Sequence, residues 1–383
     1  MNIPAMFDGI RPYTPEELPG IVDELFDDPQ FLDVVRLWYK DIPTEALRGQ
    51  AKACKNNLEV QEKLFYPLVM QLMNTCAASL TLGCPEGTDR KARHTYVSNH
   101  RDIVLDSALL SILLLKNGFG NTVEIAIGDN LLIYPWIEKL VRVNKSFIVR
   151  RSVSMHEKLE SSRLMSQYMH FAIAEKHENI WIAQREGRAK DSDDRTQESV
   201  LKMMAMGGAG TPVERLMQLN IVPLSISYEY DPCDYLKAKE FQLKRDNPGY
   251  VKSRADDLEN MRVGIFGKKG HVHYEMAQPI NTWLPELAEL PKAELFRETA
   301  ARMDKEIHRG YRLYAGNYVA ADLLDGGRRF ADHYTDAERQ AFEEYVASRV
   351  ALVDLPERDD AFLRERILTM YANPLLNQQA ARQ

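Results

Sequence analysis

The chain has 383 residues, of which 45% are hydrophobic and 27% charged, a composition typical of a globular protein that folds without disulfide bonds. Its net charge of −7 argues against nucleic acid as a partner. Its 4 cysteines lack the spacing of a metal site or a disulfide framework, so we expect free thiols in a reducing compartment.

Membrane-spanning and secreted proteins are also disfavoured by the sequence. The first residues lack the basic and apolar segments of a signal peptide. The longest apolar run, residues 103–115, is shorter than the ~20 residues of a membrane span and contains Asp106. We therefore expect a cytoplasmic protein, peripheral on the inner face of the membrane if its substrate is a lipid.

The first part of the chain, residues 1–88, is expected to be a helical region. Residues 12–80 carry apolar side chains at helical spacing. Thr14–Glu17 has the pattern of a capping box with proline at the first helical position. The polar, turn-rich segment 83–89 is expected to end this region.

Strands and helices alternate between residues 89 and 284. The expected strands are 95–98, 123–127, 146–149, 180–183 and 221–227, and the expected helices are 102–116, 134–141 and 155–176. Such alternation is typical of an α/β fold. We therefore expect a central mixed, largely parallel sheet flanked by helices, with helical regions before and after it.

The last part of the α/β region is expected to contain a hairpin. Residues 262–266 and 271–276 are predicted as its strands, joined by the turn 267–270. His271 and His273 lack nearby acidic or cysteine partners, so we predict no zinc site. Residues 285–383 are expected to be helical, with a capping box at Thr335–Glu338 and a frayed tail after Pro374.

One segment, Ser98–Asp106, has the residues of an acid–base site. A strand delivers His100 to the start of a helix, and a neutral imidazole there can take a proton from a hydroxyl if a carboxylate holds its other nitrogen. Asp102 or Asp106 could be that carboxylate. The alternative is an ordinary helix cap with His100 on the surface.

Two further segments would lie at the same edge of the sheet. The turn Gly128-Asp129-Asn130 follows one strand, and Arg150 and Arg151 follow the next. Ligands of α/β proteins bind at this edge, and arginine pairs suit phosphate. The alternatives are an ordinary turn and surface arginines. Residues 131–136 are either an apolar segment that faces the membrane or part of the hydrophobic core.

A third segment, residues 180–190, runs from a strand into Arg185, Glu186, Gly187, Arg188 and Lys190. Gly187 permits close backbone approach, and the cations could neutralise an anion. The alternative is a loop of solvated charges. Residues 131–190 carry 11 Lys and Arg against 6 Asp and Glu, so this acidic chain contains a basic island.

The three motifs are followed by a buried strand that starts Ile221-Val222-Pro223. The motifs and their order resemble those of the glycerol-phosphate acyltransferase superfamily. The resemblance covers residues 93–280. The Gly128–Asn130 turn and the following arginines are most similar to the glycerol-3-phosphate and dihydroxyacetone-phosphate branch. The resemblance implies an α/β acyltransferase core over residues 89–284, with flanking helical regions at 1–88 and 285–383.

Two spacings depart from the family pattern. The family has four residues between His and Asp, whereas Asp106 lies one position further from His100, so Asp106 takes the orienting role with Asp102 as its rival. The third family motif has Glu-Gly, a small residue and then Arg, whereas Arg188 follows the glycine directly. The arginine role therefore stays open between Arg185 and Arg188.

The resemblance implies an O-acyltransferase of phospholipid biosynthesis. His100 would be the general base. The donor would be acyl-CoA or acyl-carrier protein. The acceptor would be glycerol-3-phosphate or 1-acyl-glycerol-3-phosphate, which is lysophosphatidic acid. No metal or bound cofactor is implied. The residues implied for the acceptor are Lys145, Arg150, Arg151, Arg185, Glu186, Gly187, Arg188, Gly128, Asp129 and Asn130.

Three alternatives remain open from the sequence. The acceptor could be another lyso-lipid. Water could be the acceptor, which would make the protein an acyl thioesterase, although the basic island counts against it because water needs no anion site. The displaced aspartate also allows a non-catalytic lipid- or phosphate-binding protein.

Overall fold

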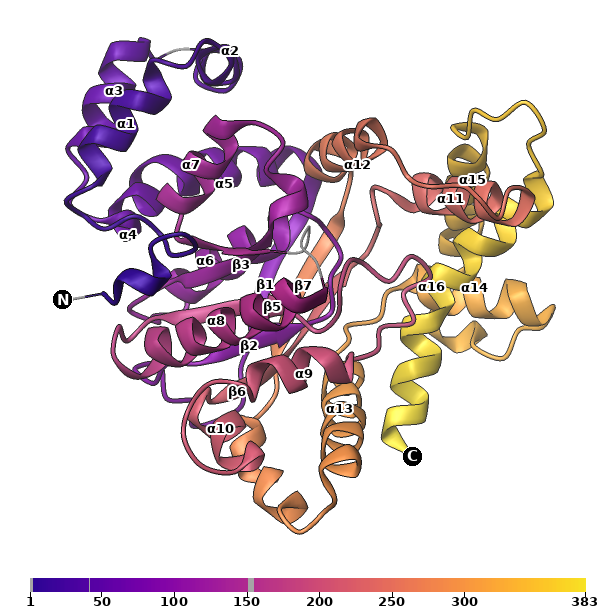
Figure 1. The fold of residues 1–383 in the computed structure, drawn as a ribbon. Coiled ribbons are helices and arrows are strands. Elements are labelled where there is room, and N and C mark those ends of the chain that lie inside the picture. Colours follow the sequence, from indigo (N-terminus) through magenta and orange to yellow (C-terminus); the bar gives the residue numbers. More distant parts are fainter. Residues whose placement is uncertain (1–2, 41, 151–154) are drawn as a thin grey trace.

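The fold is built on one seven-stranded sheet, seen in the computed structural model, which describes residues 3–40, 42–150 and 155–383 (Figure 1). Its strand order is β1-β7-β6-β2-β5-β3-β4, and all neighbours are parallel except β6 and β7. The expected mixed, largely parallel sheet is confirmed. The strands are β1 (Ala77–Gly83), β2 (Thr95–Ser98), β3 (Val123–Gly128), β4 (Ser146–Val149), β5 (Asn179–Ala183), β6 (Ile221–Tyr228) and β7 (Gly270–Met276).

The strand register brings three loops together at one edge of the sheet. Ser98, the last residue of β2, lies opposite Ala183 at the end of β5 and Leu224 in β6. Strand β6 continues past this level to Tyr228. The loops that follow β2, β5 and β6 therefore meet at the carboxyl edge, where α/β proteins place their ligands.

Helices cover both faces of the sheet (Figure 1). One face is buried under α5 (Tyr66–Cys76) and α6 (Leu105–Lys116), and α6 is apolar nearly all round because it lies between the sheet and α5. The other face is buried under α8, α9, α10 and α13. The helices of this second face are α8 (Met155–Ala174), α9 (Glu198–Met204), α10 (Pro212–Gln218) and α13 (Lys292–Arg309).

The N-terminal helices form a separate apolar cluster, packed on α7 (Pro135–Val143) beside β4. The predicted helical character of this region is right, but α1 begins at Leu18 rather than at Pro15. One half of the expected capping box is present, because the Thr14 N–H group donates to the Glu17 carboxylate at 2.6 Å, and this carboxylate also binds Arg11. The helices are α1 (Leu18–Phe26), α2 (Pro29–Trp38), α3 (Thr44–Lys52) and α4 (Asn57–Val60).

The C-terminal helices pack on a helix inserted after β6, and the Thr335 capping box is confirmed. The tail is not frayed, because α16 continues through Pro374 to Arg382 with Leu375 and Gln378 buried. The Gln378 side chain donates to the backbone oxygen of Tyr311. The helices are α11 (Asp234–Asp246), α14 (Ala315–Asp325), α15 (Asp336–Ala351) and α16 (Asp360–Arg382).

The predicted hairpin at 262–276 is wrong. Residues Arg254–Phe266 form helix α12, because Ser253 and Asp256 make a reciprocal capping box that starts a helix. Strand β7 instead pairs with β6 and with β1, a strand inside the region 1–88 that we expected to be helical. The pairing of β1 with β7 joins residues about 190 positions apart, so no local sequence pattern predicts it.

Candidate active site

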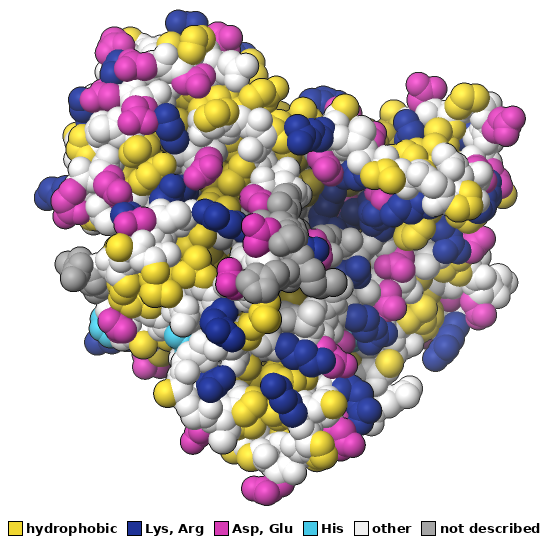
Figure 2. All heavy atoms as spheres, viewed as in Figure 1, with side chains coloured by type: hydrophobic (Ala, Val, Ile, Leu, Met, Phe, Trp, Pro, Cys, Tyr) yellow, Lys and Arg dark blue, Asp and Glu magenta, His cyan; other side chains and the backbone are white. Residues whose placement is uncertain are grey.

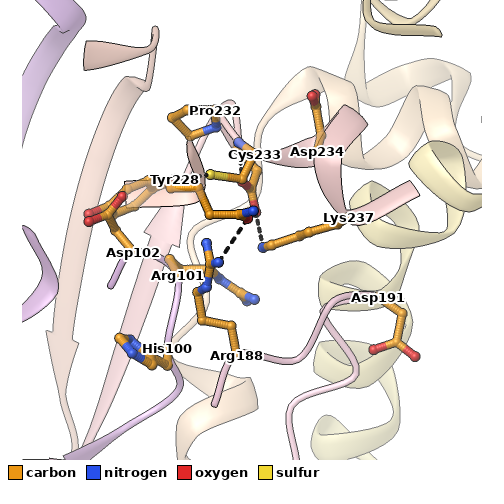
Figure 3. Close-up of polar contacts among 12 residues, drawn as sticks. His100, Arg101, Asp102, Arg188, Asp191, Tyr228, Pro232, Cys233, Asp234 and Lys237 are labelled. Atoms are coloured by element: carbon orange, nitrogen blue, oxygen red, sulfur yellow. Dashed lines mark hydrogen bonds and ion pairs between the residues drawn. The ribbon is translucent and has the colours of Figure 1, made fainter. Parts of the chain in front are cut away.

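His100 lies in the loop between β2 and α6, at the carboxyl edge of the sheet (Figure 3). The buried Asn99 fixes this loop on β6: its amide donates to the Ile226 carbonyl at 2.9 Å and accepts from the Ile226 N–H at 2.8 Å. This pair of hydrogen bonds continues the β2–β6 pairing beyond the end of β2. His100 is therefore held by sheet geometry rather than by a free loop.

Asp106, in the first turn of α6, is the carboxylate that pairs with His100. Its Oδ2 atom lies 2.8 Å from His100 Nδ1 and also accepts the backbone N–H groups of Arg101 (2.7 Å) and Asp102 (3.1 Å). Its Oδ1 atom accepts the hydroxyl of Tyr228 at 3.1 Å. The carboxylate is fully buried and has a partner for each of its oxygens.

Asp102, the rival, caps the helix instead. Its Oδ1 accepts the N–H groups of Val104 (2.9 Å) and Leu105 (2.8 Å), which are free at the start of α6. Burial, together with the nearby charge of Asp106, raises the pKa of Asp102. The geometry thus assigns the helix cap to Asp102 and the imidazole contact to Asp106, so the additional residue in the motif does not break the His–Asp pair.

The His100 ring is mostly enclosed, with its side chain 13% exposed. Its edge meets the Trp181 ring, with centroids 5.5 Å apart. The Trp181 indole donates to Ser98 Oγ at 3.0 Å, so the aromatic wall is itself fixed. Because Nδ1 contacts Asp106, the other ring nitrogen, Nε2, is the one that can take a proton from a substrate.

Arg185 and Arg188 follow β5, the neighbour of β2. The Arg188 Nη2 group donates to Asn260 of α12 at 3.0 Å. Within the described part of the chain, the buried Arg188 Nη1 and Arg185 Nε atoms have no hydrogen-bond partner. Glu186 and Gly187 are exposed, and Gly187 has φ +69°, a backbone conformation that suits glycine. These two guanidinium groups can donate to an anion.

A buried ion pair joins the His100 loop to the Arg188 loop. Arg101 Nη2 lies 2.7 Å from Asp194 Oδ2, and both side chains are almost fully buried. The Tyr311 hydroxyl donates to the same Asp194 oxygen at 2.8 Å. Because burying unpaired charge is costly, this pair keeps the two loops at a fixed separation.

Figure 3 shows Arg101 and Arg188 pointing to the centre of the site, with Lys237 of α11 reaching in from the opposite side. Lys237 donates to Asp231 in the loop after β6. Burial raises the pKa of Asp231, but Lys237 and Arg188 lower it below its usual value. Figure 2 shows a hollow at this level with Lys and Arg side chains along its wall. The basic character predicted for the site is thus supplied in part by α11, which the motifs do not include.

The structure does not bring all predicted residues to His100. Lys145 lies at the amino end of β4, the opposite edge of the sheet, where its buried Nζ contacts Glu178 at 2.7 Å and Asn121 at 2.9 Å. Its placement in the anion site is therefore a wrong prediction. Lys190 pairs with Glu240 instead of facing the site.

The second motif lies at the correct edge but further along it. The turn Gly128–Asn130 follows β3, and Arg150 follows β4, three strands from β2 and therefore roughly 14 Å away at the backbone. The exposed Arg150 guanidinium lies next to Gly9. Arg151 is outside the described residues.

Helix α12 supplies contacts that sequence patterns missed. A Cβ atom at Gly264 would lie 2.2 Å from Asp102 Oδ2, so glycine permits the helix to approach the His100 loop. Asn260, one turn earlier, holds Arg188. The Ser253 capping signal could have identified this helix, but its contacts with the site depend on the tertiary fold.

Comparison with known proteins relates the α/β region to one family. Residues 82–227, from the end of β1 to β6, match the family model described as Acyltransferase. This part of the chain is similar to the acyltransferase family. The match spans the motifs of His100, Arg188 and Pro223, and it confirms the family resemblance drawn from them.

One similar solved structure is that of the 1-acyl-sn-glycerophosphate (LPA) acyltransferase PlsC from Thermotoga maritima. The two chains are 12% identical, with a TM-score of 0.38, and the similarity covers 75% of this chain and 95% of that one. No sequence among the curated proteins matches this chain significantly.

Asp106→Asn should lower kcat by about 100-fold or more, since an amide cannot stabilise the imidazolium that forms during proton transfer. Asp102→Asn should leave kcat within about threefold, because asparagine also caps helices. Steady-state kinetics of both purified variants would measure this. A larger loss in Asp102→Asn would reverse the two roles.

Proposed function

We propose that this acyltransferase moves a fatty acyl group from a thioester donor, acyl-CoA or acyl-carrier protein, to a hydroxyl of glycerol-3-phosphate or 1-acyl-glycerol-3-phosphate. The observation that supports it most is the juxtaposition of the His100–Asp106 pair with guanidinium N–H groups of Arg185 and Arg188 that have no hydrogen-bond partner among the described residues. A base beside an anion site fits an acceptor that carries both a hydroxyl and a phosphate.

The reaction needs only one proton-transfer group. His100 Nε2 takes the proton of the acceptor hydroxyl while its oxygen attacks the thioester carbonyl, and the C–S bond then breaks. The thiolate leaves and receives the proton from the imidazolium. Asp106 holds the ring in the tautomer that presents an unprotonated Nε2 and stabilises the charged form.

The acceptor phosphate is proposed to bind Arg188 Nη1 and Arg185 Nε. Asn260 fixes the other end of the Arg188 guanidinium, so this side chain is oriented before the substrate arrives. This arrangement favours transfer over hydrolysis, because water as acceptor would make no use of the arginines. A lyso-lipid with a phosphate would use the same groups.

Thiol release from palmitoyl-CoA, with glycerol-3-phosphate and 1-acyl-glycerol-3-phosphate in parallel, tests this function. We expect release that depends on one of the acceptors and falls by about 100- to 10,000-fold in His100→Ala, the range of general-base catalysis. Equal release without acceptor would indicate a thioesterase. Near-normal transfer by His100→Ala would exclude His100 as the base.

Arg188→Gln should raise the KM for the acceptor by roughly 10- to 100-fold while leaving that for the donor within twofold, because it removes a charge-assisted hydrogen bond to phosphate. Lys190→Gln is the matched control: it removes a cation of the same loop whose amine is bound to Glu240. Parallel increases in both KM values would speak against an acceptor phosphate at Arg188.

We also propose that the carboxyl edge of the sheet meets a lipid surface. Tyr134, in the segment that follows β3, is 42% exposed, and Leu258 and Phe266 of α12 are 45% and 51% exposed. Phe266 stacks on Trp38 of α2, with ring centroids 5.2 Å apart. No helix of the described residues is long and apolar enough to cross a bilayer. Aromatic and apolar side chains near the reaction edge suit partial insertion among lipid headgroups.

The double variant Tyr134→Ser with Phe266→Ser should bind phosphatidylglycerol vesicles at least about fivefold more weakly, since it removes apolar area that the lipid would cover. Co-sedimentation with vesicles measures this. Leu376→Ser, which changes a 45% exposed leucine on α16, should bind like the wild type. Unchanged binding of the double variant would place the membrane contact elsewhere.

A further inference from the structure

The two oxygens of Asp106 are held by different parts of the protein. Oδ2 is hydrogen-bonded to His100 Nδ1 and to two backbone N–H groups of the same loop, so its partners among the described residues lie within residues 100–102. Oδ1 receives the hydroxyl of Tyr228, which belongs to β6. Only the second contact ties the carboxylate to the sheet.

We propose that Tyr228 is a positioning residue for acyl transfer, acting on the base His100 through Asp106. The inference rests on the proposed role of His100 and extends it to a side chain outside the motifs that suggested the function. Tyr228 would act through the hydrogen bond that its hydroxyl donates to Asp106 Oδ1.

The strand register explains why Tyr228 reaches this position. Leu224 lies opposite Ser98, the end of β2, and β6 continues for four more residues to Tyr228. The His100 loop crosses this extension and is tied to it by Asn99 and Ile226. Tyr228 is therefore presented from a rigid, fully buried strand to the underside of the loop.

The chemistry of a carboxylate gives this contact its effect. Rotation of an aspartate carboxylate about its terminal torsion is soft, so donors on Oδ2 alone would let the group swing. A donor on Oδ1 fixes the plane of the carboxylate and with it the orientation of the imidazole. Because Asp106 is fully buried, the hydroxyl also gives Oδ1 the hydrogen-bond partner that a buried carboxylate oxygen needs.

A second tyrosine offers a matched control. Tyr274, on the adjacent strand β7, donates its hydroxyl to the backbone oxygen of Asp106 at 2.9 Å. Both tyrosines are buried, and burial raises the pKa of both well above the usual value, so both act as neutral donors. Tyr228 contacts the carboxylate of Asp106, whereas Tyr274 contacts its main chain.

The experiment compares Tyr228→Phe and Tyr274→Phe, each alone and combined with Asp106→Asn, in the full-length protein. Phenylalanine keeps the ring and its volume. We expect Tyr228→Phe to lower kcat roughly tenfold, the typical effect of losing a hydrogen bond to a charged group, with both KM values within twofold. Tyr274→Phe should lower kcat less than threefold, although it should lose about as much thermal stability as Tyr228→Phe.

The double variants separate positioning from general stability. If Tyr228 acts through the carboxylate, Tyr228→Phe should lower kcat less than twofold further once Asp106 is asparagine. An unchanged kcat in Tyr228→Phe, or the same tenfold loss in both backgrounds, would overturn the proposal. Near-normal activity of His100→Ala would instead overturn the proposed function, whatever Tyr228 does.

Discussion

The fully buried carboxylate of Asp106 is the group on which the candidate site depends. It is hydrogen-bonded to His100 Nδ1, two backbone N–H groups and the Tyr228 hydroxyl, so one side chain joins the His100 loop, helix α6 and strand β6. A buried charge is tolerated only when it is fully hydrogen-bonded. The same bonds that permit its burial therefore also define where His100 can lie.

The rest of the site is arranged around this loop by side chains that hold loops to one another. Arg101 and Asp194 join the His100 loop to the Arg188 loop, and Asn260 joins the latter to α12. Lys237 brings α11, and with it the C-terminal helices, to Asp231. Helices α11 and α12 thus complete the walls of a candidate site whose His100 and Arg188 lie within residues 82–227, the part that matches the family model.

Local patterns were sufficient for much of this architecture. Buried parallel strands have β-branched runs and short turns, so β2 to β6 were predictable, as was the basic edge near Arg188. The pairing of β1 with β7 and the structural role of Lys145 were not, because each depends on partners distant in sequence: Ala77 with Gly270, and Lys145 with Glu178. Asp102 and Asp106 were equal candidates from the residues alone and only the resemblance favoured Asp106, since the start of α6 at Leu105 decides which one caps the helix.

The one-residue displacement of Asp106 has a consequence for recognising other members of this group. Helix α6 starts so that an aspartate six positions after the histidine still meets the imidazole, and a hydroxyl five positions after Pro223 secures it. A search pattern with the fixed His-to-Asp interval would discard such chains as inactive. A pattern that accepts either interval would retain them.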